Sequence, residues 1–191
     1  MTKNEAVERL LNCGSGLFEF RSDTTEERHM MASWAAINAS WGALELRLWL
    51  AFAPIDTALS REWAVHFFEE ESKKKVRVRK ALEAIAPSDA EFQRLLNEAL
   101  AAVQSAKDAR NPLAHGVWTR QGTAIVVLPL RVDDAGTLAD PIFVTPQLLS
   151  DINRRIRRAV NLLAVLGAEC LAHDWLKKYA ARRAKAIAGS G

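Results

Sequence analysis

With 191 residues, of which 49% are hydrophobic and 26% charged, the chain has the length and composition of one globular domain, which excludes extensive disorder. The net charge of +3 is too small to identify a polyanionic partner by itself. No apolar run approaches the roughly 20 residues that cross a bilayer, and residues 1–10 are too polar for a secretory signal. We therefore expect a cytoplasmic protein that does not associate with membranes.

The N-terminal part of the chain predicts an appendage followed by a strong helix. Residues 1–22 are expected to be the appendage, with a short amphipathic helix in it. Thr24 and Glu27 then have the spacing of a capping box, and apolar residues follow at alternating intervals of four and three. These apolar residues are Met30, Trp34, Ile37, Trp41, Leu44 and Leu48. They predict a helix that faces a core and ends before Pro54.

The middle of the chain predicts two further helices. The first, over about 60–86, is expected to break near Ser72, where the apolar pattern lapses. The second is expected to begin with Ser88 and Glu91, which again have capping-box spacing. Pro112 should end or kink this helix, because proline lacks a backbone donor and its ring clashes with the preceding turn.

A change of periodicity after Val117 predicts a small β-hairpin at about 117–144. Residues 124–132 are rich in β-branched and apolar side chains, and the turn-like residues 133–136 lead to a second apolar stretch at 142–144. The hairpin would be an insertion before the last helix.

The last predicted element is one long helix that runs to about Ala188. Thr145 before Pro146 has the pattern of an N-cap residue followed by a proline in the first helical position. Together with the earlier elements, this predicts a mainly α protein. We expect one domain over 23–188, built as a bundle of four to five helices with the inserted hairpin.

The segment from Asp108 to Trp118 contains the strongest candidate for a site. Arg110, Asn111 and His115 place a permanent cation, an amide and an imidazole within six residues. An imidazole can take a proton from a ribose 2′-hydroxyl, and a guanidinium can neutralise charge on phosphoryl oxygens, so this combination suits phosphodiester chemistry. On an ideal helix Arg110 and His115 would lie roughly 140° apart, so a kink is needed for both to face one substrate.

The pattern Arg-Asn-x-x-x-His, followed by Gly116 and Trp118, resembles the R-x4-6-H motif of HEPN domains. The likeness in organisation covers about 24–170, while the hairpin lies outside the minimal HEPN domain. It implies a helical homodimer in which two motifs form one composite site that cleaves RNA without a metal ion. Many HEPN proteins act in defence, stress response or toxin–antitoxin biology, so the resemblance also suggests an antitoxin protein as a partner.

The same resemblance assigns roles to the three motif residues. Arg110 would bind and stabilise the phosphate, Asn111 would position the pair, and His115 would act in general acid–base transfer. The stretch Trp41 to Glu45 also resembles the early helix of related bacterial proteins, in which an acidic residue often points toward the motif. Glu45 is therefore a secondary candidate, and the alternative is that it stays solvated or pairs with a nearby arginine.

The segment after Pro146 has a clear excess of basic over acidic residues, which could track a nucleic-acid backbone. The alternative is the solvated outer face of a long helix. The RNA-binding candidates in this segment are Arg154, Arg155, Arg157 and Arg158. No metal or other cofactor is expected, because Cys13 and Cys170 lie far apart and no histidine has ligand spacing.

Two functions of different classes are compatible with these features. The first is a metal-independent endoribonuclease that leaves a cyclic phosphate end. The second is a non-catalytic dimer that binds RNA or protein, in which the motif is a helix end and His115 hydrogen-bonds a carbonyl. A small-molecule or nucleotide-binding bundle ranks last, because the sequence has no Gly-rich phosphate loop.

Overall fold

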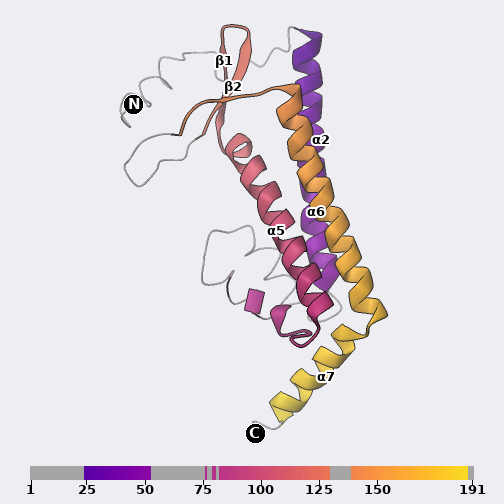
Figure 1. The fold of residues 1–191 in the computed structure, drawn as a ribbon. Helices are drawn as coiled ribbons and strands as arrows, with labels where there is room; N and C mark the ends of the chain where they lie inside the picture. The colour runs from indigo at the N-terminus through magenta and orange to yellow at the C-terminus, as the bar shows by residue number, and fades with distance from the viewer. Residues whose placement is uncertain (1–23, 53–75, 77–78, 81, 130–138, 189–191) are drawn as a thin grey trace. The chain divides into compact units, whose positions relative to one another are not determined.

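The computed structural model describes residues 24–52, 76, 79–80, 82–129 and 139–188. The chain is mainly helical there, as expected (Figure 1). Its elements are α2 (Thr25–Phe52), α5 (Ala90–Ala114), β1 (Val117–Gln121), β2 (Ala124–Leu128), β3 (Ile142–Phe143), α6 (Pro146–Ala172) and α7 (Trp175–Ala188). The expected N-terminal appendage, most of the helical region over 60–86 and the turn at 133–136 lie outside the described residues.

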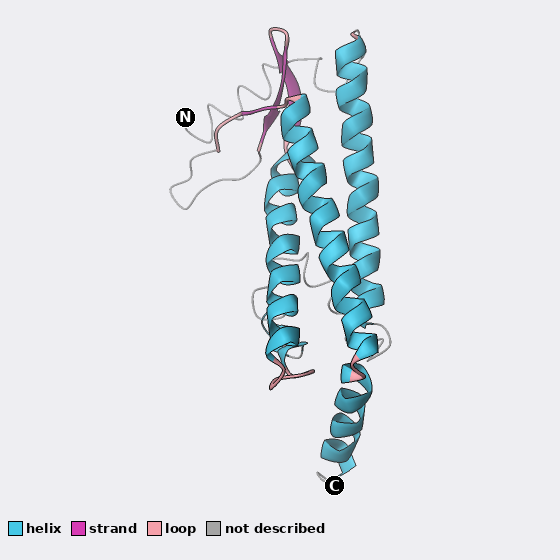
Figure 2. Ribbon diagram, turned by 45° about the vertical axis from the view of Figure 1, so that its right-hand side comes forward, coloured by secondary structure: helices cyan, strands magenta, loops and turns pink. Residues whose placement is uncertain are grey.

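The chain divides into two compact units. Unit 1 comprises residues 1–38 and 105–154, and unit 2 comprises 39–104 and 155–191. Unit 1 contains the three strands and one segment each of α2, α5 and α6, whereas the described part of unit 2 is helical (Figure 2).

The capping box predicted at the start of α2, in unit 1, is confirmed. The backbone N–H of Glu27 donates to Thr24 Oγ1 at 3.1 Å, and the N–H of Thr24 donates to Glu27 Oε2 at 3.2 Å. Glu27 is 7% exposed, and Arg120 of β1 pairs with its other carboxylate oxygen at 2.5 Å. The buried carboxylate therefore fixes the first turn of the helix and joins it to the sheet.

The capping box predicted for α5 at Ser88 and Glu91 is wrong. Asp89 caps the helix instead, because its Oδ1 accepts the N–H of Phe92 at 3.0 Å. Glu91 turns to the helix surface and pairs with Arg94 at 2.6 Å. Aspartate and serine are similarly good N-cap residues, so neighbouring candidates make the starting residue of a helix hard to predict.

The sheet of unit 1 has three antiparallel strands in the order β1-β2-β3. The pairing of β2 with β3 confirms the two strands expected from the sequence, with Val126 opposite Phe143. Strand β1 lies in the segment predicted as a hairpin but was not assigned as a strand; it pairs with β2 through a turn whose first central residue is Gly122, with φ +62°. Glycine adopts that backbone geometry without the steric cost that other residues meet.

The single long final helix expected from the sequence is two helices. Its start is confirmed, because Thr145 Oγ1 accepts the N–H of Leu148 at 3.1 Å. The helix then ends at Ala172, and Asp174 takes a left-handed conformation with φ 52° before α7 begins. Glycine is the usual residue in this conformation at the end of a helix, but aspartate also tolerates it. The sequence therefore has no glycine at this position that would have predicted the break.

Each unit has its own set of buried apolar side chains. In unit 1 they include Met30, Ile37, Leu113, Ile125, Val127, Val144, Leu149 and Ile152. In unit 2 they include Trp41, Leu44, Leu48, Phe92, Leu96, Val103, Ile156, Leu163, Leu166 and Cys170. The apolar ladder predicted for α2 is thus buried, with Trp34 only half-buried. No helix among these residues is long and apolar enough to span a bilayer.

The buried thiol of Cys170 should be inert. Burial, and secondarily the charge of Glu169, raises its pKa to about 12. At pH 8 only roughly one such thiol in ten thousand is the reactive thiolate. In a Cys13→Ser variant, Ellman's reagent should release almost no thionitrobenzoate until guanidinium unfolds the chain; complete reaction within minutes under native conditions would contradict this.

Candidate functional site

The motif segment lies at the end of α5, within unit 1. The helix does not end at Pro112, as one reading of the sequence expected, but continues to Ala114. The N–H of His115 donates to the carbonyl of Asn111 at 3.0 Å, which is the normal helical spacing. A helical hydrogen bond therefore forms beyond the proline, and Asn111 belongs to the last turn of the α5 helix.

Gly116 allows the end of α5 to pack directly on strand β2. A Cβ atom at this position would lie 2.3 Å from Val127 Cγ1, 2.6 Å from the carbonyl oxygen of Pro112 and 2.9 Å from that of Leu128. Two of these neighbours are backbone atoms, which cannot move aside as a flexible side chain could. Residue 116 must therefore be glycine for the helix and the sheet to meet at this distance.

Trp118 also has a structural role beside the motif. Its indole N–H donates to the carbonyl of Leu113 at 2.8 Å, so it satisfies one of the acceptors that a helix leaves unpaired at its C-terminus. Its ring lies against Trp34 of α2, with the ring centroids 5.3 Å apart and the planes tilted by 44°. This aromatic contact stabilises the packing of α2 against strand β1.

Arg110 is half-buried and oriented by a residue that the sequence had not singled out. Its Nη2 donates to Asn38 Oδ1 at 3.0 Å. The Nδ2 of Asn38 donates in turn to the carbonyl of Trp34, also at 3.0 Å, which fixes the orientation of the amide. Asn38 thus holds the guanidinium against α2 by a hydrogen bond between residues 72 positions apart.

His115 differs from its neighbours in the motif because the fold makes little use of its side chain. The residue is exposed, and its imidazole has no hydrogen bond or ion pair with another residue in the described ranges. The carbonyl bond expected if the motif were purely structural is therefore not seen there. Asn111, one helical turn earlier, is half-buried.

Arg110 and His115 leave α5 in different directions. The N–H of His115 still bonds to the carbonyl of Asn111, and ideal helical geometry continued to His115 would separate the two side chains by roughly 140°. An arginine side chain is long enough to cover part of that angle, but one copy of the helix does not present both groups on the same face. Together the two groups supply a fixed cation and an exposed proton acceptor at one helix end.

The secondary candidate Glu45 lies on α2 in unit 2. The residue is exposed, and its Oε1 accepts the indole N–H of Trp41 at 2.9 Å. Arg110 is contacted instead by Asn38, two helical turns earlier in α2. The sequence did not indicate a role for Asn38, because its partner Arg110 is 72 positions away and becomes its neighbour only in the folded protein.

The four arginines proposed for RNA binding are exposed on α6, between the buried positions of that helix. Arg154 belongs to unit 1 and pairs with Asp151 at 2.6 Å, while the other three belong to unit 2. Arg158 approaches Glu98 at 3.6 Å. Ion pairs between side chains this exposed contribute little to the free energy of unfolding. Arg154 and Arg158 could therefore leave their carboxylate partners and bind a phosphate with little loss of stability.

Within the described ranges, no group of three or more His, Cys, Asp or Glu residues could hold a metal ion. No family model, curated protein or solved structure matches the chain. The chemistry of the site must therefore be inferred from its own residues.

Alanine at position 116 should destabilise the protein. The Gly116→Ala methyl group would overlap backbone and side-chain atoms, and such overpacking lowers the free energy of unfolding by about 3 kcal/mol. Gly42→Ala is the matched control, since nothing lies within 4 Å of its Cβ and α2 should gain about 0.8 kcal/mol. Urea denaturation monitored by circular dichroism measures both; equal effects would contradict the close packing at Gly116.

The hydrogen bond between Asn38 and Arg110 should appear as an energetic coupling. In a double-mutant cycle of Asn38→Ala and Arg110→Ala, unfolding free energies should deviate from additivity by about 1 kcal/mol. Asn38→Ala combined with Arg94→Ala, a surface residue paired within α5, should be additive within about 0.5 kcal/mol. Additivity in both cycles would show that the bond does not contribute.

Proposed function

We propose that this protein is a metal-independent endoribonuclease of the HEPN type, with Arg110, Asn111 and His115 as its catalytic residues. The observation that carries the proposal is the contrast at the end of α5. Gly116 and Trp118 are accounted for by packing, whereas the imidazole of His115 is exposed and the guanidinium of Arg110 is oriented by Asn38. Cleavage through a 2′-hydroxyl requires both an oriented cation and an accessible proton acceptor, and these two residues supply one of each.

In the proposed reaction the substrate supplies its own nucleophile. A neutral imidazole takes the proton of the 2′-hydroxyl, the 2′-oxygen bonds to phosphorus, and the bond from phosphorus to the 5′-oxygen breaks. The departing 5′-oxygen receives a proton from an imidazolium, so the products are a 2′,3′-cyclic phosphate and a free 5′-hydroxyl. Arg110 neutralises charge on the phosphoryl oxygens in the transition state, and Asn111 positions the reacting groups.

The proposed active form is a homodimer, as the HEPN resemblance implies. Since one copy of α5 points Arg110 and His115 roughly 140° apart, two copies of the motif facing each other would supply the cation, the base and the acid to one phosphate. Exposed arginines of α6, Arg154 among them, would contact the RNA backbone through charge. Glu45 stays a secondary candidate in this proposal.

The biological setting follows from the HEPN resemblance alone. We place the protein in the cytoplasm, in defence, stress response or toxin–antitoxin biology. In the last case an antitoxin protein would bind the dimer and block access to His115.

The second candidate is a non-catalytic dimer that binds RNA or protein through the same surface. The structural roles of Gly116 and Trp118 favour it, because packing and one hydrogen bond account for both residues without any chemistry. Such a module would bind RNA with an affinity that falls steeply with salt, and would release it unchanged.

A labelled mixed RNA pool incubated with the protein in EDTA tests the proposal. The wild type should cleave it and leave cyclic phosphate ends, and His115→Ala should lower the rate by about 100-fold or more, as loss of a general acid–base group does. Arg110→Ala should also lose activity. His29→Ala is the matched control, because His29 is likewise exposed in unit 1 but lies outside the motif, and it should cleave like the wild type.

Two results would overturn the proposal. One is equal cleavage by His115→Ala and His29→Ala, which would assign the activity to a contaminant or to another site. The other is a folded dimer that binds RNA with a steep salt dependence and leaves every strand intact, which is the behaviour of the binding module. Light scattering of the same samples gives the oligomeric state.

A further inference from the structure

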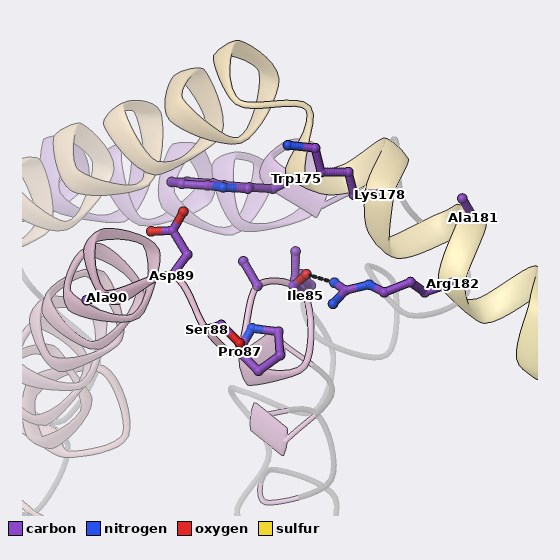
Figure 3. A pocket seen from close by; sticks show the side chains of 10 residues that line it. Ile85, Pro87, Ser88, Asp89, Ala90, Trp175, Lys178, Ala181 and Arg182 are labelled. Carbon is purple, nitrogen blue, oxygen red and sulfur yellow. Dashed lines mark hydrogen bonds between the residues drawn. The ribbon is translucent and has the colours of Figure 1, made fainter.

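A pocket lies in unit 2, away from the motif in the sequence. It has a volume of about 800 Å³ and is formed by the segment before α5, the first residue of α5, and the first turns of α7 (Figure 3). Small-molecule sites in proteins have volumes of about 300–1,000 Å³. The pocket is thus large enough for a compact organic molecule.

Most of the pocket lining is apolar. Figure 3 shows the indole ring of Trp175 along one side, with Ile85 and Pro87 across the space from it. Trp175 is 5% exposed and packs edge-on against Phe92, with the ring centroids 5.0 Å apart, so this wall is held by the core. A rigid apolar wall favours a ligand with a flat or compact apolar body.

Two of the four polar side chains that line the pocket are cationic, and both come from α7. Arg182 donates to the backbone carbonyl of Ile85, which holds its guanidinium at the pocket, and Lys178 lies one turn earlier. Helix α7 contains five basic residues and no acidic residue, so its field is positive along its length. The carboxylate of Asp89 also lines the pocket, but it caps α5 through the N–H of Phe92, and the helix dipole offsets part of its charge.

We propose that this pocket binds a small amphipathic organic anion. Its apolar body would lie between Trp175 and Pro87, and its carboxylate, sulfonate or phosphate would face Arg182. The flexible side chain of Lys178, which Figure 3 draws on the other side of the indole ring, would turn toward the same anionic group. The site uses no residue of the nuclease motif. The proposed anion site therefore does not depend on the proposed ribonuclease activity, and each can be tested without the other.

The dye 8-anilinonaphthalene-1-sulfonate, an aromatic anion whose fluorescence rises in apolar surroundings, is a suitable probe for the full chain. It should bind the wild type saturably, and Lys178→Glu should weaken binding about tenfold because an attraction becomes a repulsion. Lys177→Glu is the matched control: Lys177 is the neighbouring lysine of α7, but it pairs with Asp174 at 3.0 Å and does not line the pocket. It should change the dissociation constant less than about twofold.

Two further measurements separate the pocket from the charge of α7 as a whole. Ala181→Trp places a bulky side chain at the pocket and should abolish binding, and the uncharged dye N-phenyl-1-naphthylamine should bind at least about tenfold more weakly than the anion. Equal weakening by the two lysine variants, or equal affinity for the charged and uncharged dyes, would overturn the proposal. If Ala181→Trp lowers the melting temperature, the two lysine variants, both at exposed positions, still decide the outcome.

Discussion

The close contact between the end of α5 and strand β2 is the constraint on which the rest of unit 1 depends. At Gly116 two backbone carbonyls and the side chain of Val127 come within a distance that excludes any Cβ atom. The chain can turn from helix into β1 there only because residue 116 has no side chain. This contact fixes where α5 ends, and so where His115 emerges from the helix and which residues of β1 face α2.

Polar and aromatic contacts then attach α2 to this junction. The carboxylate of Glu27 caps its own helix and pairs with Arg120, and Trp34 packs on Trp118. Asn38 adds the contact to Arg110. Because Glu27 is almost fully buried, its charge depends on these partners to offset the cost of desolvation. The same contacts that stabilise unit 1 therefore restrain Arg110 of the motif.

Features with local causes could be predicted from the sequence, and those with distant causes could not. The capping box at Thr24 and the cap at Thr145 involve residues three apart, and both are present. The cap of α5 was assigned one residue early, because Ser88 and Asp89 are equally suitable and only the completed fold selects between them. The role of Asn38 depends on a partner 72 positions away, so no local pattern indicated it. Strand β1 lies inside the segment predicted as a hairpin, but its short polar sequence was not assigned as a strand.

The motif separates into residues that folding requires and residues that it does not. Replacing Gly116 or Trp118 would remove a packing contact or a hydrogen bond of the helix end, so their presence carries no information about chemistry. His115 is exposed and makes no such bond among the described residues, so stability gives no reason for an imidazole at that position. Arg110 is intermediate, since Asn38 both stabilises and orients it. A functional interpretation therefore depends on His115, with Arg110 as the group whose placement the fold has already arranged.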